Sequence, residues 1–265
     1  MNQRSRRALV TGASSGIGAA TARHLAASGY SVALLARNRE RLEALCAQLD
    51  GEGHFVLTCD LTEPTSIEAA LREVDQRFEG LDLLVNNAGI GYRARVAELD
   101  PILLRQLFDT NVLAILHTCR AALPLLERGD SPVVVNIASV VGRRGIPGQV
   151  AYAASKAAVC SIGEGLRVEW ADEGIAVCTL DPALTATGFF EAQPNPSDLP
   201  HPDLADAAGP EQIAAEVVAL DRHPKPERTL RWKWHLLGLL SLLTPRLADR
   251  LLVRSLGGDW RAPRR

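Results

Sequence analysis

The sequence predicts a single α/β domain built on a doubly wound, parallel, seven-stranded sheet with helices on both faces. Short apolar segments alternate with longer segments of helical periodicity. The apolar segments are too continuous for strands that face water on one side, so both of their faces should be buried. A glycine-rich turn follows the first of them, and no low-complexity linker divides the 265 residues. These observations predict one Rossmann domain over residues 1–265.

The individual elements follow in chain order. Six strands are predicted at residues 7–11, 31–36, 53–58, 81–86, 132–138 and 175–180, with helices at 16–28, 38–50, 64–79, 99–127, 152–173 and 211–222. The helix at 99–127 has a clear start, because Asp100 can cap it and Pro101 suits its first turn. Residues 229–234 alternate polar and apolar side chains, the period of an edge strand, and are predicted to be strand seven.

Composition narrows the class of protein. The chain is 47% hydrophobic and 23% charged with a net charge of −2, so it lacks the basic field that recruits nucleic acid. Its five cysteines show no Cys-x-x-Cys pair and no metal-ligand spacing. The apolar run at residues 8–10 is too short for a secretory signal. We expect a cytoplasmic protein with reduced thiols and no metal.

The glycine-rich turn is the first candidate binding site. It lies directly after the first strand and opens a helix, which is the context of a dinucleotide-binding turn. Its glycines let the backbone approach a pyrophosphate, which then rests on the N–H groups at the helix start. The predicted cofactor contacts in the turn are Gly12, Ser14, Ser15, Gly16, Ile17 and Gly18.

The end of the second strand predicts which cofactor is used. An NAD site would carry Asp or Glu here for the ribose 2′-hydroxyl, whereas this chain has Ala36, Arg37 and Asn38. A guanidinium can bind a 2′-phosphate through two hydrogen bonds, and a carboxylate would repel it. We expect NADP(H) to be preferred over NAD(H), with Arg37 and Asn38 near the phosphate. The alternative is that Arg37 is a solvated residue at a helix start.

Polar residues also follow the third and fourth strands. Asp60 and Leu61 follow the third, and Asn87, Ala88 and Gly89 follow the fourth. Because the carboxyl ends of parallel strands share one edge of the sheet, we expect these residues to contact the cofactor, with Asp60 near the adenine amino group. Each is unspecific alone, since Asp and Asn are common in turns.

A second cluster can transfer protons. Tyr152 and Lys156 are four residues apart in a predicted helix and share one face. We expect the ammonium group and an oxidised nicotinamide both to favour the phenolate of Tyr152, and the ammonium also to hold the nicotinamide ribose. Ser139, at the end of a strand, is placed to hydrogen-bond a substrate oxygen. Asn111, taken alone, is expected to be a helix-surface amide.

The motifs together resemble the compact, single-domain branch of the short-chain dehydrogenases/reductases. They are Thr-Gly-x-x-x-Gly-Ile-Gly at 11–18, Asn-Asn-Ala-Gly at 86–89, Asn111, Ser139 and Tyr-x-x-x-Lys at 152–156, and the resemblance runs over about residues 6–222. It implies a catalytic tetrad of Asn111, Ser139, Tyr152 and Lys156, in which Asn111 holds a water that relays protons through Lys156. It also implies cofactor contacts from Tyr152 and Lys156.

The activity implied by the resemblance is hydride transfer between a nicotinamide and a carbonyl carbon, which interconverts a ketone or aldehyde and an alcohol. We expect reduction with NADPH, and a homodimer or homotetramer formed through the helices at 99–127 and 152–173. Two alternatives stay open: a 3-oxoacyl-type ketoreductase, and a non-catalytic protein that senses NADP(H). The sensing protein is the less favoured alternative, because all four proton-transfer residues are present.

The chain departs from the family after the sixth strand, where Pro182-Ala183 replaces the usual Pro-Gly and Thr187 is expected to contact the cofactor amide. The proline-rich residues 183–210 are predicted to form a substrate lid. The hypothesised pocket, for a fairly lipophilic substrate, consists of Tyr92, Val141, Phe189 and Phe190. Arg143 and Arg144 are expected in a solvated loop, with recognition of an anionic substrate as the alternative.

An apolar extension at about 235–256 continues past the point where acyl-carrier ketoreductases of the family commonly stop. The run is too short to span a bilayer. It could form a wall of the substrate pocket, an oligomer contact, or an amphipathic segment on a membrane surface. We favour packing against the rest of the protein.

Overall fold

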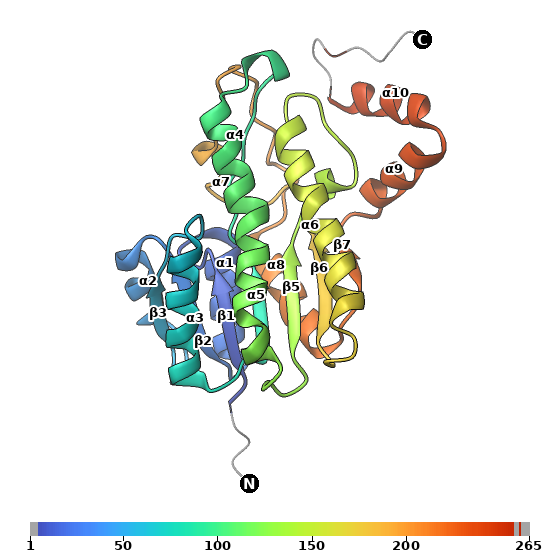
Figure 1. Ribbon diagram of the computed structural model, residues 1–265. Helices are drawn as coiled ribbons and strands as arrows, with labels where there is room; N and C mark the ends of the chain where they lie inside the picture. Colours follow the sequence, from blue (N-terminus) through green and yellow to red (C-terminus); the bar gives the residue numbers. More distant parts are fainter. Residues whose placement is uncertain (1–4, 257–259, 261–265) are drawn as a thin grey trace.

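The computed structural model describes residues 5–256 and residue 260. Its seven strands form one parallel sheet in the order β3-β2-β1-β4-β5-β6-β7 (Figure 1). The strands are β1 (Arg7–Thr11), β2 (Ser31–Ala36), β3 (Phe55–Thr58), β4 (Leu83–Asn86), β5 (Val133–Ile137), β6 (Ala176–Asp181) and β7 (Glu227–Thr229). This order confirms the predicted doubly wound sheet. The first three strands are added toward one edge, from β1 to β3, and the later strands are added toward the other edge, beginning with β4 beside β1.

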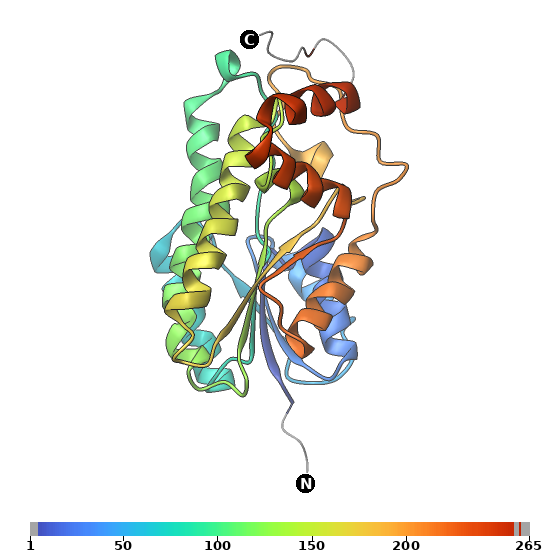
Figure 2. The same cartoon turned by 90° about the vertical axis from the view of Figure 1, so that its right-hand side faces the viewer.

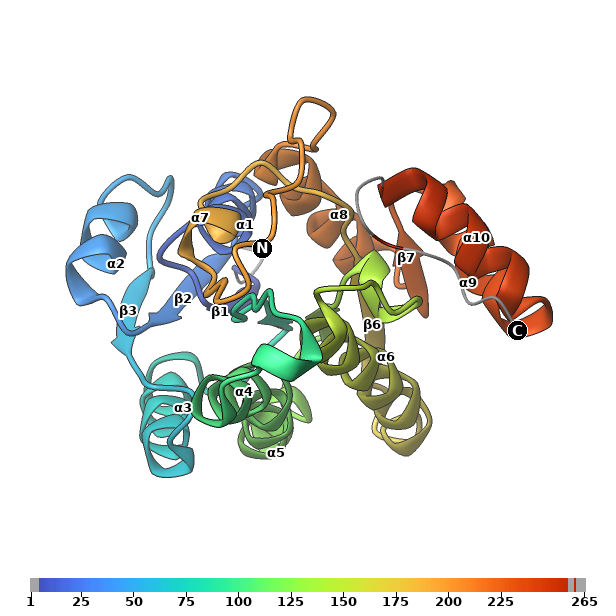
Figure 3. The same cartoon turned by 90° about the horizontal axis from the view of Figure 1, so that it is seen from above.

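Helices cover both faces of the sheet (Figure 3). Along β1, Leu9 packs in one apolar cluster with α3 and α5, while Ala8 and Val10 pack in a second cluster with α1 and α8. Burial on both faces explains why the strand sequences are continuously apolar. The helices are α1 (Gly16–Ala27), α2 (Arg39–Cys46), α3 (Pro64–Phe78), α4 (Pro101–Phe108), α5 (Ala114–Leu126), α6 (Val150–Glu169), α7 (Phe189–Ala192), α8 (Pro210–Arg222), α9 (Trp232–Leu243) and α10 (Pro245–Leu256).

The helix predicted over residues 99–127 is interrupted in its first half. Asp100 caps α4 as expected, because its Oδ1 accepts hydrogen bonds from the Ile102 and Leu103 N–H groups at 2.7 and 3.1 Å. A π-helical turn, Asp109–Leu113, then separates α4 from α5. Such turns often occur at functional sites. This one contains Asn111, whose side chain is fully buried, so the expectation of a helix-surface amide was wrong.

The predicted position of strand seven was also wrong. β7 ends at Thr229, which pairs with Asp181 at the end of β6, and α9 begins at Trp232. The residue after Asp181 is Pro182, which has no N–H group to continue the ladder. Without a neighbouring strand, the apolar residues that follow form a helix. Among residues 5–256, no helix is long and apolar enough to cross a bilayer.

A buried ion pair joins β1 to the start of β4. Asp82 accepts hydrogen bonds from the Arg7 main-chain N (2.7 Å), Nε (3.0 Å) and Nη2 (2.6 Å), and from the Asp130 N–H (2.7 Å). Burial alone would raise the pKa of Asp82, but the hydrogen bonds from Arg7 and Asp130 outweigh it and lower the pKa. The carboxylate is therefore charged and fully paired in the folded protein.

We expect Asp82→Ala to lower the free energy of unfolding by about 3–5 kcal/mol, because it leaves the Arg7 guanidinium buried without its partner. The pKa of Asp82 is lower when folded, so its contribution is complete above about pH 4 and is lost as the pH falls through the folded value. Urea unfolding at neutral and acid pH measures both effects. Glu43→Ala, which removes an exposed pair with Arg39, is the control and should cost under about 0.5 kcal/mol.

Candidate functional site

The glycine-rich turn between β1 and α1 has a shape that only small residues permit. Gly12 has a φ of +65°, and a Cβ on Gly18 would lie 2.3 Å from the Gly12 carbonyl oxygen. The N–H groups of Asn87 and Ala88 donate to Thr11 Oγ1 at 3.0 and 3.1 Å, which fixes the end of β4 against the turn. The turn is therefore a close-packed cradle whose backbone stays accessible to a ligand.

The start of α1 offers unused N–H groups at this cradle. Ser15 is the N-cap residue, and its side chain accepts no hydrogen bond from the first helical turn. Thr187 lies across the turn, with its Cγ2 at 3.4 Å from the position of a Cβ on Gly16. Ser14, Gly16 and Ile17 are partly exposed beside it. These residues could hold a pyrophosphate and a neighbouring amide, which is the role that the sequence predicts for them.

The substitution at Pro182-Ala183 does not disturb this edge. Ala183 adopts no left-handed backbone, since the non-glycine residues with positive φ in the described part of the chain are Glu79, Ser131 and Asp198. Pro182 keeps its carbonyl oxygen bonded to the Val140 N–H at 3.0 Å. The extra methyl group of alanine is therefore compatible with the backbone found here.

Arg37, Asn38 and Asp60 lie at the ends of β2 and β3. Arg37 is exposed, and the described residues form no ion pair with it. Asn38 caps α2, because its Oδ1 accepts from the Arg41 N–H at 2.9 Å. Hydrogen bonds from Thr62 lower the pKa of Asp60, and the charge of Arg37 contributes to the same shift. Leu61 is packed in the core behind them. The guanidinium is thus free to bind an anionic group.

The four residues of the predicted tetrad come together beside the end of β4. A Cβ on Gly89 would lie 3.3 Å from Asn111 Oδ1 and 3.4 Å from Lys156 Nζ, so both polar groups face Gly89. Lys156 Nζ donates to the Ile137 carbonyl oxygen at 2.9 Å and lies 6.0 Å from the centre of the Tyr152 ring. Ser139 hydrogen-bonds Tyr152. Strands β4 and β5, the π-helical turn before α5, and helix α6 position this group.

Asn111 uses its whole side chain to hold neighbouring segments. Oδ1 accepts from the Ile90 N–H at 2.8 Å, while Nδ2 donates to the Ile90 carbonyl oxygen at 2.9 Å and to Ser155 Oγ at 3.1 Å. The amide has no hydrogen left for another acceptor. The side chain therefore joins the loop after β4 to α6 at the centre of the predicted tetrad.

Burial sets the protonation of Tyr152 and Lys156. It raises the pKa of Tyr152 well above the ordinary value, and the hydrogen bond with Ser139 only partly opposes this. The sequence led us to expect that Lys156 and an oxidised nicotinamide together favour the phenolate of Tyr152. In the protein alone, burial outweighs any such effect and the pKa is raised. Burial also lowers the pKa of Lys156 to about 8, with the Cys160 thiol and Asp181 acting against it. Tyr152 is thus a protonated phenol at neutral pH.

Arg143 and Arg144 are not in a solvated loop, as the sequence suggested. Arg143 Nε lies 2.9 Å from Asp181, and its Nη2 lies 3.1 Å from Glu227. Arg144 pairs with Asp249 of α10. These contacts fix the turn that starts at Ser139, η3 (Val140–Gly142), against β6 and β7. No local pattern singles out Asp181, because an acidic residue at a strand end carries no signal of its distant partner.

The predicted lid is held in place by hydrogen bonds at its base and along its length. Thr185 and Ala208 form a β-bridge at its base, and the Arg93 N–H donates to the Pro194 carbonyl oxygen at 3.0 Å. Arg93 Nη2 also reaches the Pro200 carbonyl oxygen at 2.6 Å. The segment 183–210 therefore lies over the strand-end loop 90–95.

The four hypothesised pocket residues occupy different layers around Tyr152. The Phe189 and Tyr152 ring centres are 5.7 Å apart, and Phe190 packs on Phe189 at 5.6 Å. Val141 is partly exposed on the turn after Ser139. Tyr92 is almost fully buried beneath Tyr152, and its hydroxyl accepts from the Asp100 N–H at 2.7 Å. Phe189 thus packs on the Tyr152 ring, and Phe190 packs on Phe189.

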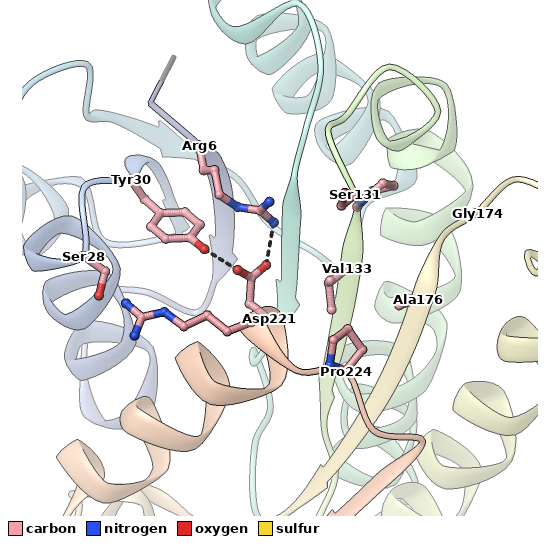
Figure 4. Close-up of a pocket in the computed structure, with 11 residues that line it drawn as sticks. Arg6, Ser28, Tyr30, Ser131, Val133, Gly174, Ala176, Asp221 and Pro224 are labelled. Atoms are coloured by element: carbon pink, nitrogen blue, oxygen red, sulfur yellow. Dashed lines mark hydrogen bonds and ion pairs between the residues drawn. The ribbon is translucent and has the colours of Figure 1, made fainter. Parts of the chain in front are cut away.

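A separate hollow of about 420 Å³ opens at the opposite, amino end of the strands (Figure 4). Asp221 of α8 pairs there with Arg6 at 2.9 Å and accepts a hydrogen bond from the Tyr30 hydroxyl. Burial and this hydrogen bond raise the pKa of Tyr30 to about 12. Asp221 uses one carboxylate oxygen for each of these two contacts, so we assign the three side chains to the docking of α8 rather than to chemistry.

Comparison with known proteins identifies the family. A family model described as short chain dehydrogenase matches residues 6–197. An uncharacterized oxidoreductase of Mycobacterium tuberculosis (strain ATCC 25618 / H37Rv) is 35% identical over 248 residues, covering 91% of this chain and 95% of the relative. Another from Staphylococcus aureus (strain NCTC 8325 / PS 47) is 34% identical over 203 residues, covering 76% and 87%.

Solved structures show the same fold. An alcohol dehydrogenase from the archaeon Thermococcus sibiricus, complexed with 5-hydroxy-NADP, has a TM-score of 0.76 at 29% identity and covers 86% of this chain and 97% of its own. A 3-ketoacyl-(acyl-carrier-protein) reductase from Brucella melitensis, complexed with NADH, shares the fold with a TM-score of 0.77 at 24% identity, covering 85% and 96%. With its glycine turn and its Tyr-x-x-x-Lys pair on one edge of the sheet, this chain belongs to the short-chain dehydrogenase family of oxidoreductases.

Proposed function

We propose that this protein is an NADP(H)-dependent reductase of lipophilic ketones or aldehydes, and that it also oxidises the corresponding alcohols. The observation that carries the proposal is the meeting of Ser139, Tyr152, Lys156 and Asn111 beside Gly89, under the Phe189 ring. A hydroxyl pair that can hold a carbonyl oxygen, with an ammonium group behind it, suits proton transfer to that oxygen.

The cofactor would lie along the carboxyl edge of the sheet. The glycine turn would hold the pyrophosphate, while Asp60 and Leu61 would contact the adenine. Arg37 and Asn38 would bind the 2′-phosphate. The nicotinamide half would be held by Asn87, Ala88, Gly89, Lys156, Pro182 and Thr187. The bound nicotinamide supplies or accepts the hydride. The free guanidinium of Arg37 supports NADP(H) over NAD(H), because no carboxylate follows Ala36 at the end of β2.

The side chains of the site divide the proton chemistry among them. Ser139 donates a hydrogen bond that polarises the substrate carbonyl, and Tyr152 delivers its proton to the oxygen as the alkoxide forms. Burial keeps Tyr152 protonated, which suits the donor role that reduction requires. Lys156 then returns a proton toward Tyr152, and a water held by Asn111 resupplies Lys156.

Substrate class and assembly follow from surfaces near the site. The apolar cover of Phe189 and Phe190 supports a lipophilic substrate. Exposed apolar side chains on α4, the π-helical turn, α5 and α6, namely Ile102, Leu113, Leu116 and Val168, support a homodimer or homotetramer formed through this part of the chain. The proposal places the enzyme in the cytoplasm.

The direct test is cofactor oxidation by the purified protein against aliphatic ketones, aryl ketones, steroids, quinones and β-keto esters, with NADPH and NADH in parallel. Turnover that favours NADPH and larger apolar ketones is the expected result. Tight NADPH binding without turnover on any of them would instead favour a sensing protein. Turnover that favours NADH would remove the role proposed for Arg37.

The low pKa of Lys156 predicts how reduction depends on pH. The ammonium form is lost as the pH rises through about 8, so kcat for reduction should fall above this value. Asp181 raises the pKa of Lys156, so Asp181→Asn should move this alkaline fall to lower pH. Glu227→Gln is the matched control, because it contacts the same Arg143 yet does not act on Lys156. An unshifted profile in Asp181→Asn would refute the assignment.

A further inference from the structure

The C-terminal helices α9 and α10 leave a row of leucines in solvent. Leu242 and Leu243 at the junction of the helices have exposed fractions of 81% and 82%. Leu236 and Leu239 of α9, and Leu247 and Leu251 of α10, extend the exposed row on either side. Soluble monomers rarely expose apolar side chains in such a continuous group, which usually marks an interaction surface. The leucine row is the set of these six side chains.

The hairpin of α9 and α10 is fixed to the body of the protein by its inner side. Ala248 and Leu252 of α10 are buried, and Asp249 pairs with Arg144. Gly238 of α9 packs closely on Arg143, because a Cβ placed on this glycine would lie 3.3 Å from the Arg143 Cβ. The packing expected from the sequence therefore accounts for one side of the hairpin. The leucine row lies on the side that this packing does not cover.

Cations border the leucine row. Arg246, Arg250 and Arg254 follow one another at four-residue spacing along α10, next to the line of Leu247 and Leu251. All three arginines and Lys233 of α9 are exposed, and the described residues form no ion pair with them. The single acid between residues 231 and 256 is Asp249, which Arg144 already neutralises. The outer side of the hairpin is thus apolar and positively charged.

We propose that the α9–α10 hairpin docks this protein on an anionic lipid surface, with the leucine row among the acyl chains and the arginines at the headgroups. Long arginine side chains can reach the headgroups while their stems lie along apolar surface. The hairpin and the lid lie at the same end of the molecule (Figure 2), so a docked protein presents its site entrance toward the membrane. This inference does not depend on the proposed reaction.

A second copy of the chain fits the same surface less well. A symmetric dimer brings the same patch of both chains together. Here that contact would set Arg246, Arg250 and Arg254 against their own copies without acidic partners, and like charges across an interface are costly. Anionic phospholipid supplies the missing negative charge over a whole surface.

The test is co-sedimentation of the full-length protein with vesicles of phosphatidylcholine alone or mixed with phosphatidylglycerol. We expect pelleting with the mixed vesicles, weakened by high salt, and little with phosphatidylcholine alone. Leu242→Ser/Leu243→Ser should reduce binding at least about tenfold, because two side chains no longer bury apolar surface. Arg250→Gln/Arg254→Gln should reduce it by about tenfold.

Matched controls distinguish binding through this surface from non-specific adsorption to vesicles. Val96→Ser changes an apolar side chain with an exposed fraction of 63%, which lies outside the hairpin and outside the helices proposed for assembly, and it should pellet like the wild type. Arg23→Gln/Arg72→Gln removes two exposed arginines from α1 and α3 and should do the same. Thermal unfolding of all variants checks the fold, and each altered side chain is exposed.

Three results would overturn the proposal. The wild type could stay in the supernatant with mixed vesicles, or the leucine variant could pellet as strongly as the wild type. Light scattering could instead show an oligomer that the Leu242→Ser/Leu243→Ser change dissociates. The leucine row would then be an interface between copies.

Discussion

Tyr152→Phe should lower kcat for carbonyl reduction by about 10²–10⁴-fold and leave the Kd for NADPH unchanged. The substitution removes the one hydroxyl that both hydrogen-bonds Ser139 and lies beside Lys156, while it keeps the ring that packs on Phe189. A positioned proton donor contributes a factor of this size. Stopped-flow measurement of NADPH oxidation gives the rate, and fluorescence titration gives the affinity.

Tyr30→Phe is the matched control for this experiment. Tyr30 is also a buried tyrosine with a raised pKa, but its hydroxyl bonds Asp221 at the opposite end of the sheet. The loss of a hydrogen bond to a charged group should cost about 1.5–3 kcal/mol of stability and leave kcat unchanged. If Tyr152→Phe kept normal turnover, the proposed proton donor would be wrong. If it abolished NADPH binding as well, the loss of rate would not report on proton transfer.

Arg37→Glu should reverse the cofactor preference. Loss of charge-assisted hydrogen bonds to a 2′-phosphate costs about 1.5–3 kcal/mol, so Arg37→Ala should reduce kcat/KM for NADPH by about 10–150-fold and spare NADH. A glutamate at the same place adds repulsion of the phosphate and can accept hydrogen bonds from the free ribose hydroxyls of NADH. The ratio of kcat/KM for the two cofactors measures the change.

The neighbouring Arg39 provides the control for Arg37. It is exposed on α2 and pairs with Glu43 at 2.7 Å. Arg39→Ala should change neither cofactor's kcat/KM. Equal losses with NADPH and NADH in Arg37→Ala, or no loss at all, would mean that Arg37 is the solvated residue at a helix start that the sequence left as an alternative.

The sequence predicted the parts of this protein that depend on local pattern. Strands buried on both faces have continuous apolar sequences, so six strands and their helices were visible without coordinates. The glycine turn was visible because its residues are adjacent in the chain. Tyr152 and Lys156 were visible because a four-residue spacing places them on one helical face. Asp100 was recognisable as a cap because it immediately precedes Pro101.

Other features depend on contacts between distant residues, which no local pattern encodes. Arg143 meets Asp181 across 38 positions and Arg144 meets Asp249 across 105, so their roles appeared only after folding. The end of β7 was decided by the end of its neighbour, because β6 stops at Asp181, which pairs with Thr229.

By itself, the sequence determined the doubly wound sheet, and it picked out the glycine turn and the four polar residues of the proposed site. Only the tertiary structure decided that Tyr152 stays protonated and that Lys156 has a lowered pKa, because both shifts come from burial. It also decided which leucines of the C-terminal extension remain in solvent. Burial is a property of packing between elements, whereas periodicity and spacing are properties of the chain.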